Sequence, residues 1–470
     1  MIRSVRISPL CFLFGAAALW LAPLRGAPAL PALWAPRVKS VVAVEYYTET
    51  ESDRRPTIAY GTAVDNRGTI ILPSSAVDAR VPPKQLQQFK VYLPGDPTGY
   101  DGTYLGQDVF TGCHYVRADP KLAAQLTPVT AWAAPAGTPA PAMADEVWGI
   151  GLRNKDEDFA PYILVSHIAI VQSLPQRTAI AQQEVAGPGL PVFNRAGFLI
   201  GIAASSFGQT YLEFSRLERA GTPVMLVDLE ESSAFVLADE IVPYFGRVPQ
   251  NIYGRPLAWL GAYGLEPMDR EVASFLRLSA QSGAVVSEVL EDSPAEKAGM
   301  KDHDIILAID GQPLPRFRPY RIVTDYVERE IERRKPGDVM TLTVLRGSDR
   351  VELKAPLGEE PKLIREAERK YFERLGFTVR EFVYGDAVAR RIKTGEASGV
   401  VISYVKPNGP AAIAGAGVED WVKEIDGVAV KSFSEAAARL AAIEADSGRG
   451  EFVLLVSHGS DTSILRVKLR

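Results

Sequence analysis

The order of hydrophobic and polar residues divides the chain into a short apolar leader, a long strand-rich region and a C-terminal region where strands alternate with helices. In residues 59–77, small and apolar side chains alternate up to a turn at 65–68 and continue in the apolar run 69–72. Alternation interrupted by a short turn that contains Asn and Gly predicts a β-hairpin. The alternating stretch 164–171 predicts a further strand.

An ordered set of motifs occurs twice after residue 251, which indicates two modules of the same kind. Each copy has an apolar-glycine-apolar tripeptide, an apolar strand, a Pro-Ala motif that ends in glycine, and an Ile-Asp-Gly turn. A proline that begins a short helix and a glycine that ends it are common helix boundaries. Both copies continue into an amphipathic helix. The motifs stand at 260–262, 283–289, 293–299 and 309–311, with the helix at 321–334, and again at 375–377, 399–405, 409–415 and 425–427, with the helix at 434–443.

The first residues combine a basic start, at Arg3 and Arg6, with an apolar run at 9–24 and an Ala-x-Ala sequence at 27–29. This pattern predicts a secretory signal peptide at residues 1–29. The apolar run is shorter than the roughly 20 residues that a membrane-spanning helix needs. We therefore expect an exported protein, periplasmic or extracellular, with no stable membrane span after cleavage.

Composition adds limits on partners and on covalent links. The formal net charge is −5, which argues against nucleic acid and anionic membranes as partners. Because Cys11 leaves with the leader, Cys113 has no intramolecular disulfide partner. With 47% hydrophobic residues in 470, several packed domains are expected. Residues 359–371, rich in Lys, Glu and Arg, predict a charged helical linker between the two motif copies.

The hairpin at 59–77 resembles the start of the HtrA/Deg family of trypsin-like serine proteases, and later stretches continue the likeness. In that family the catalytic histidine follows the second strand of this hairpin, and the matching position here is Ser75. The catalytic aspartate follows a threonine at the start of a strand, where this chain has Gly112. The nucleophile stands in Gly-Asn-Ser-Gly-Gly-Pro-Leu, and its counterpart within 186–192 is Pro188. The resemblance therefore implies the family's framework with a degenerate triad.

These replacements remove the groups that acyl transfer needs. The reaction requires an activated hydroxyl, an imidazole that accepts its proton and a carboxylate that orients the imidazole. Pro188 has no hydroxyl and no backbone N–H, so it also removes a donor to the oxyanion. Loss of one such donor lowers a rate roughly a hundredfold or more. The sequence thus predicts no standard catalytic residue, no metal site and no cofactor.

Other side chains leave an alternative open. An active peptidase is possible if Ser74, Ser75 or Ser166 acts with His114 or His167, the histidines of this region. Against it, the two serines at the position of the base fit a turn that bonds the local backbone.

Two further residues have structural interpretations. Cys113 and His114 are strand neighbours whose side chains point to opposite faces, so they do not pair as nucleophile and base. We interpret Cys113 as a small buried hydrophobe. His167 alternates like a strand residue that faces outward or into a polar pocket, and no second ligand accompanies it at metal-site spacing.

The two motif copies resemble PDZ domains in the circularly permuted bacterial arrangement, and the likeness covers nearly all of residues 251–470. A PDZ domain binds an extended peptide as an added strand, and the amides of the apolar-glycine-apolar loop bind its terminal carboxylate. Apolar residues one turn apart on the following helix line the side-chain pocket, although such residues equally fit a core. The predicted peptide-binding residues are Leu260, Gly261, Ala262, Val327 and Ile331 in the first copy, and Leu375, Gly376, Phe377, Ala436 and Leu440 in the second.

The expected fold is mainly β with α. It comprises a chymotrypsin-like double β-barrel at 38–248, a PDZ domain at 251–358, the linker at 359–371 and a second PDZ domain at 372–470. Each PDZ domain is expected to be a small, partly open barrel with two helices.

The favoured function is that of an exported pseudoprotease that binds unfolded or C-terminal protein segments as scaffold, chaperone or regulator. The alternative is an active endopeptidase of periplasmic protein quality control with non-standard catalytic residues. The family resemblance also implies a homo-oligomer, a trimer.

Overall fold

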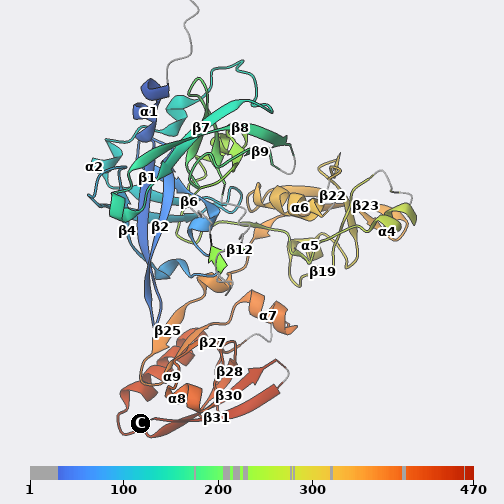
Figure 1. The fold of residues 1–470 in the computed structure, drawn as a ribbon. Coiled ribbons are helices and arrows are strands. Elements are labelled where there is room, and N and C mark those ends of the chain that lie inside the picture. The colour runs from blue at the N-terminus through green and yellow to red at the C-terminus, as the bar shows by residue number, and fades with distance from the viewer. Residues whose placement is uncertain are drawn as a thin grey trace, which may run out of the picture.

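The computed structural model describes residues 30–173, 176–204, 212–214, 223–225, 231–275, 278, 281–317, 321–393, 398–459 and 461–469. The predicted leader at 1–29 lies outside these residues. In the described ranges, no helix is long and apolar enough to cross a membrane. Figure 1 shows two β-barrels in blue and green, then a mixed module in yellow and a last mixed module in orange and red.

The first barrel closes six antiparallel strands in the order β1-β2-β3-β6-β5-β4. Its β2–β3 pair is the predicted hairpin of 59–77. The Asp65 carboxylate holds the turn, because it accepts hydrogen bonds at 2.9 Å from the amides of Arg67 and Thr69. The barrel contains β1 (Val41–Glu49), β2 (Arg54–Ala63), β3 (Thr69–Leu72), β4 (Leu86–Tyr92), β5 (Tyr100–Gln107) and β6 (His114–Ala118), with η1 (Ser74–Ala76), η2 (Pro83–Gln85) and α2 (Pro120–Ala123) between strands.

The second barrel closes in the order β10-β11-β14-β9-β8-β7. Buried Ile71 of the first barrel and buried Trp148 and Phe193 of the second belong to one hydrophobic cluster, so the barrels share a core. The predicted double barrel is confirmed. This part contains β7 (Glu146–Leu152), β8 (Pro161–Gln172), β9 (Thr178–Ala181), β10 (Pro191–Asn194), β11 (Leu199–Ala203) and β14 (Ala234–Leu237), with η3 (Val129–Trp132), η4 (Lys155–Glu157), α3 (Ala238–Ile241) and η5 (Val242–Tyr244), and the separate pair β12 (Leu212–Phe214) and β13 (Pro223–Met225).

A buried arginine ties the first helix, α1 (Leu30–Val38), to the second barrel. Arg37 Nε donates a hydrogen bond of 2.7 Å to the carbonyl of Gly197. The guanidinium also lies 4.4 Å from the centroid of the Trp132 ring, within cation–π range. Because β1 follows α1 almost directly and belongs to the first barrel, this contact links both barrels at their N-terminal end.

The third part is built on the sheet β17-β18-β20-β22-β23. The predicted amphipathic helix is present as α6, with Val323 and Val327 buried. The Pro-Ala motif forms the short helix α5, and the amide of Glu296 donates to the hydroxyl of the N-cap residue Ser293 at 3.1 Å. The elements are β15 (Ala258–Trp259), β16 (Ala262–Tyr263), β17 (Glu266–Pro267), α4 (Arg270–Phe275), β18 (Ala284–Val285), β19 (Glu288–Val289), α5 (Pro294–Lys297), β20 (Ile305–Ile309), β21 (Gln312–Pro313), α6 (Ile322–Glu332), β22 (Val339–Arg346), β23 (Asp349–Pro356) and β24 (Gly358–Glu359).

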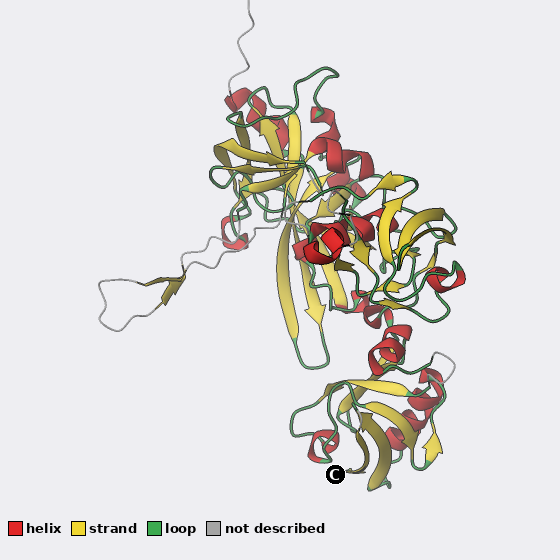
Figure 2. Cartoon of the chain, turned by 90° about the vertical axis from the view of Figure 1, so that its right-hand side faces the viewer, coloured by secondary structure: helices red, strands yellow, loops and turns green. Residues whose placement is uncertain are grey.

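The fourth part repeats this plan with the sheet β25-β26-β27-β28-β30-β31. Figure 2 shows its helices packed beside the curved strands, next to the marked C-terminus. The second predicted amphipathic helix is present as α9. The elements are η6 (Ile364–Glu366), β25 (Arg369–Phe372), β26 (Phe377–Glu381), α7 (Tyr384–Arg390), β27 (Val400–Val405), α8 (Pro410–Ile413), β28 (Trp421–Ile425), β29 (Val428–Ala429), α9 (Phe433–Ala445), β30 (Glu451–His458) and β31 (Asp461–Lys468).

The helical linker predicted at 359–371 is wrong. This segment holds the end of β24, the single 3-10 turn η6 and most of β25. Its charged side chains suit a solvated helix, but tertiary contacts override that preference. Arg255 Nε donates to the Glu366 carboxylate at 3.0 Å, and the same guanidinium donates to the Pro361 carbonyl at 2.9 Å. At the end of β25, Phe372 is fully buried.

A buried ion pair joins β26 to α7. Arg380 donates to both carboxylate oxygens of Asp386, at 2.6 and 2.8 Å, and to Glu419 at 2.9 Å. The side chains of Arg380 and Asp386 are each 1% exposed. Removing one member of such a pair leaves an uncompensated buried charge.

We expect Asp386→Ala to lower the free energy of unfolding by about 3–5 kcal/mol, the usual cost of breaking a buried pair. Urea unfolding followed by circular dichroism measures this loss. The control is Glu451→Ala, which removes the exposed partner of Arg466 and should change stability little. Equal effects of the two substitutions would contradict the role given to the buried pair.

Candidate functional site

The three predicted triad positions lie on loops that meet where the two barrels join. Ser75 is exposed in η1, and Gly112 lies between β5 and β6. A Cβ atom placed on Gly112 would lie 3.2 Å from the Cβ of Ser74. On the third loop, a Cβ placed on Gly189 would lie 2.6 Å from Pro73 Cδ. The loops of Gly112 and Pro188 thus both touch the segment that leads into Ser75.

The loop around Pro188 turns its amides into the barrel. Gly187 N donates to Ile150 O at 3.0 Å, and Gly189 N donates to Ala203 O at 2.9 Å. Ala186 N makes a longer bond of 3.5 Å to Ser232 O. Since Pro188 has no N–H, every amide from 186 to 189 has a backbone carbonyl as acceptor. The loop therefore offers no free pair of amides to an oxyanion.

His114 is buried and uses both ring nitrogens. Nδ1 lies 2.8 Å from the Tyr104 hydroxyl, and Nε2 lies 3.3 Å from the backbone carbonyl of Ser74. A carbonyl oxygen only accepts, so Nε2 carries the proton, and Nδ1 accepts from Tyr104. Burial lowers the pKa of His114 to about 4, and the positive charge of Arg365 adds to this effect. The imidazole is therefore neutral at pH 7, and its lone pair is already occupied.

The remaining candidates for an alternative catalytic group are placed apart. His167 is exposed on β8, whereas its neighbour Ser166 is buried and accepts a hydrogen bond of 3.1 Å from Gln183 N. Cys113 is buried, as predicted, and burial raises the pKa of its thiol to about 12. A protonated thiol is a poor nucleophile. Within the described ranges, no group of three or more His, Cys, Asp or Glu residues could hold a metal ion.

Tyr104 was not anticipated from the sequence. The β5–β6 register shifts between Tyr104 and Gly106, a bulge that breaks the strict alternation of side chains along β5. Tyr104 opposes Val116, while Gln107 opposes His114. A simple strand pattern gives no signal for the ring contact that results.

In the third part, the loop 260–262 presents two backbone amides that have no acceptor among the described residues. Its carbonyls point inward: Ala295 N donates to Leu260 O at 2.8 Å, and Leu290 N to Gly261 O at 3.0 Å. The amides of Leu260 and Gly261 donate to no atom of the described residues. Gly261 has φ +81°, a backbone conformation that favours glycine.

The edge that follows this loop carries no further strand among the described residues. β16 pairs only with β19, and β17 pairs only with β18. Of the two predicted pocket residues on α6, Val327 is fully buried in the core, and Ile331 is half-buried. Ile331 is therefore the more accessible of the two.

The corresponding edge in the fourth part is occupied by the chain itself. β25 pairs with β26 in an antiparallel register from Phe372 opposite Phe377 to Arg369 opposite Arg380. Gly376 N donates to Phe372 O at 2.8 Å, which closes the loop as a hairpin turn. The two predicted pocket residues on α9, Ala436 and Leu440, are fully buried.

Arg374 fixes this closed arrangement. Its guanidinium donates at 2.9 Å to the carbonyls of Glu444 and Arg449, at and beyond the C-terminal end of α9. Cations at a helix C-terminus are favourable because the unpaired carbonyls there carry partial negative charge. The apolar-glycine-apolar pattern indicates the loop, but no local pattern indicates these hydrogen bonds of Arg374.

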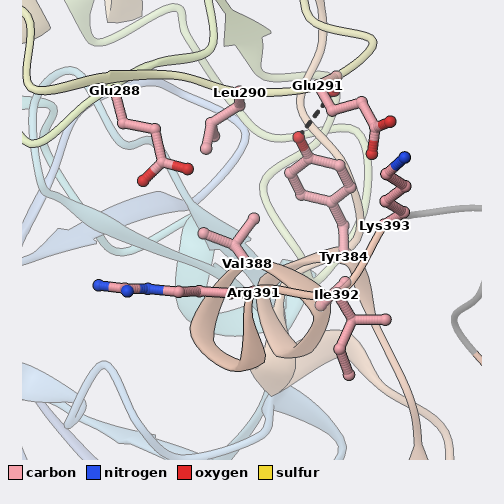
Figure 3. Close-up of a pocket in the computed structure, with 9 residues that line it drawn as sticks. Glu288, Leu290, Glu291, Tyr384, Val388, Arg391, Ile392 and Lys393 are labelled. Carbon is pink, nitrogen blue, oxygen red and sulfur yellow. Dashed lines mark hydrogen bonds between the residues drawn. The ribbon is translucent and has the colours of Figure 1, made fainter. Parts of the chain in front are cut away.

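A cavity of about 270 Å³ lies between the third part and α7 (Figure 3). Glu288, Leu290 and Glu291 form one wall, and Tyr384 and Val388 project from the helix on the other side. The Tyr384 hydroxyl donates to the Glu291 carbonyl at 2.9 Å, the dashed line in Figure 3. The segment that follows β19 in the third part is thus in direct contact with α7.

Comparison with known proteins agrees with this architecture. Residues 261–357 match the model of a PDZ domain. The chain is 28% identical over 287 residues to a probable periplasmic serine endoprotease DegP-like of Pseudomonas fulva, covering 57% of this chain and 53% of the relative. A protein of the same name from Chlamydia pneumoniae is 26% identical over 204 residues, 43% of this chain and 39% of the relative. The chain thus spans about half the length, or less, of these curated relatives.

Solved structures show the same fold. A variant of the HtrA-type protease AlgW with a decapeptide aligns with a TM-score of 0.50 at 16% identity, over 71% of this chain and 98% of the other. A variant of that protease with a tripeptide also gives a TM-score of 0.50, at 18% identity over the same shares. The chain is a homologue of the HtrA/DegP-like serine endoproteases and carries a PDZ domain at residues 261–357.

Proposed function

We propose that this protein is an exported, periplasmic HtrA-like pseudoprotease that binds unfolded or C-terminal protein segments as a scaffold, chaperone or regulator. The observation that carries the proposal is the loop 186–189, whose amides donate to barrel carbonyls and whose Pro188 supplies neither nucleophile nor donor. The relatives are named periplasmic, which supports the location. Resemblance to HtrA proteins further supports a homo-trimer.

The electrostatic state of His114 supports the absence of the standard reaction. A general base works best when its pKa lies near the operating pH. The pKa of His114 is lowered to about 4, and the Tyr104 hydroxyl donates to its unprotonated ring nitrogen, Nδ1. Ser74 approaches this ring through its carbonyl, which cannot be activated as a nucleophile.

We assign peptide binding to the first PDZ module. An incoming peptide would extend the sheet at the edge of β16 and β17 and place its carboxylate at the amides of Leu260 and Gly261. We propose that residues 372–470 form a second PDZ module whose groove is filled by β25. Its role would then be structural, since a peptide cannot pair with β26 while β25 does.

Casein incubated with the signal-free chain should yield no new amino termini by mass spectrometry. Pro188→Ser should be equally inactive, because a hydroxyl alone lacks a base and an oxyanion site. Trypsin at a matched concentration serves as the positive control. New casein termini produced by the wild-type chain would refute the pseudoprotease and favour an active enzyme with non-standard residues.

A fluorescent peptide with an apolar C-terminal residue should bind, which a rise in its fluorescence anisotropy measures. Its C-terminally amidated form should bind at least about tenfold more weakly, a loss of about 1.4 kcal/mol in binding free energy. Ile331→Glu should weaken binding by a similar factor, because it places a charge beside the peptide's carboxyl end. The matched control is Val339→Ser, which removes an exposed apolar side chain of β22 in the same module. Equal binding of free and amidated peptides would exclude carboxylate recognition.

The lowered pKa of His114 predicts a defined pH dependence of stability. Between pH 6.5 and about 4 the unfolded chain binds a proton at this ring and the native chain does not, so stability falls as the pH falls. This group contributes up to about 1.4 kcal/mol per pH unit.

Urea unfolding at pH 7 and pH 4.5 should therefore show a smaller pH-dependent loss for His114→Gln than for the wild type. At pH 7 the ring is neutral in the native chain, so the difference in unfolding free energy between the wild type and His114→Gln at this pH measures only the lost packing. Subtracting it leaves the part that depends on pH. Identical pH-dependent losses in both chains would show that His114 titrates normally.

A further inference from the structure

A second cavity, of about 380 Å³, lies where the first barrel meets the fourth part. The β1–β2 hairpin reaches down to β25 in Figure 1, and the Thr378 hydroxyl of β26 donates to the Glu51 carboxylate at 2.8 Å. Lys84 of η2 contributes from the barrel side, and Arg365 and Arg369 from the chain that leads into and through β25. None of these residues belongs to the degenerate triad or to a predicted peptide groove.

Two arginine side chains at this cavity have an unused donor. The Nε atoms of Arg365 and Arg369 are buried and make no hydrogen bond to any of the described residues. The other ends of both guanidinium groups are engaged: Arg365 donates to Gln107 Oε1 at 3.2 Å, and Arg369 to Ile364 O at 2.8 Å. Buried donors without an acceptor are costly and rare in folded proteins. Both arginines line the same cavity.

The positive charges at this cavity also lack ion-pair partners among the described residues. Within the described part of the chain, neither arginine nor Lys84 takes part in an ion pair, whereas the nearby Arg380 is paired with two carboxylates. Burial and the neighbouring charge of Arg380 lower the pKa of Arg369, so the site disfavours an unpaired cation there. The carboxylates of Glu51 and Glu368 also line the cavity and oppose the three cations only in part.

We propose that this cavity binds an oxyanion, the phosphate or carboxylate group of a small molecule, through the guanidinium groups of Arg365 and Arg369, with Lys84 at its edge. Guanidinium groups form strong, charge-assisted hydrogen bonds to both kinds of oxyanion. The volume falls within the range of small-molecule sites and leaves room for an organic body beside the anionic group. Tyr371 of β25, a further lining residue, offers an aromatic wall for that body.

The test is calorimetric titration of the full chain with inorganic phosphate and, separately, with malonate, at constant ionic strength. We expect saturable binding of at least one anion. Arg365→Gln and Arg369→Gln should each weaken it about tenfold or more, and Lys84→Gln several-fold. The matched control is Arg80→Gln, which removes a cation that is 91% exposed, paired with Asp78 and outside the cavity. The Arg80→Gln chain should bind the anion with the affinity of the wild type.

Circular dichroism shows whether the arginine variants fold. If they do not, Lys84→Gln still tests the site, because Lys84 is exposed and its substitution should leave the fold intact. Binding of phosphate alone or of malonate alone supports the site and identifies the anionic group. The proposal is overturned if neither anion binds saturably, or if folded Arg365→Gln and Arg369→Gln chains bind as the wild type does.

Discussion

The need of every buried amide for an acceptor governs the junction of the two barrels. Around Pro188, the barrel carbonyls of Ile150 and Ala203 take the available N–H groups, which packs the loop against the sheet. A loop arranged in this way gains stability from bonds that an oxyanion site would have to leave open. The neutral, doubly bonded His114 on the other side of the junction follows the same rule, because burial favours its uncharged and fully paired form.

The two C-terminal modules also differ in which of their backbone amides have acceptors. In one, the amides of Leu260 and Gly261 remain available at an open sheet edge. In the other, β25 supplies the edge hydrogen bonds, and Arg374 holds the adjoining helix end. Two copies of one sequence pattern thus end in different states, because the segment that precedes the loop pairs with β24 in the first and with β26 in the second.

Much of this architecture can be predicted from local sequence. The turn at Asp65, the proline-started helices and the buried position of Cys113 follow from residue type and alternation. The strand β25 could not be predicted, because its charged residues favour a solvated helix until Phe372 is buried against the fourth part. The Tyr104–His114 contact depends on a bulge, and the unused donors of Arg365 and Arg369 depend on packing between segments far apart in the chain.

The backbone at Gly112 limits which residues this position accepts. Its φ of +70° strains any side chain with a Cβ, and that atom would come within 3.2 Å of Ser74. A carboxylate introduced here would meet a main-chain conformation that favours glycine, beside the side chain of Ser74. Introducing a side chain at this position therefore costs stability that glycine avoids.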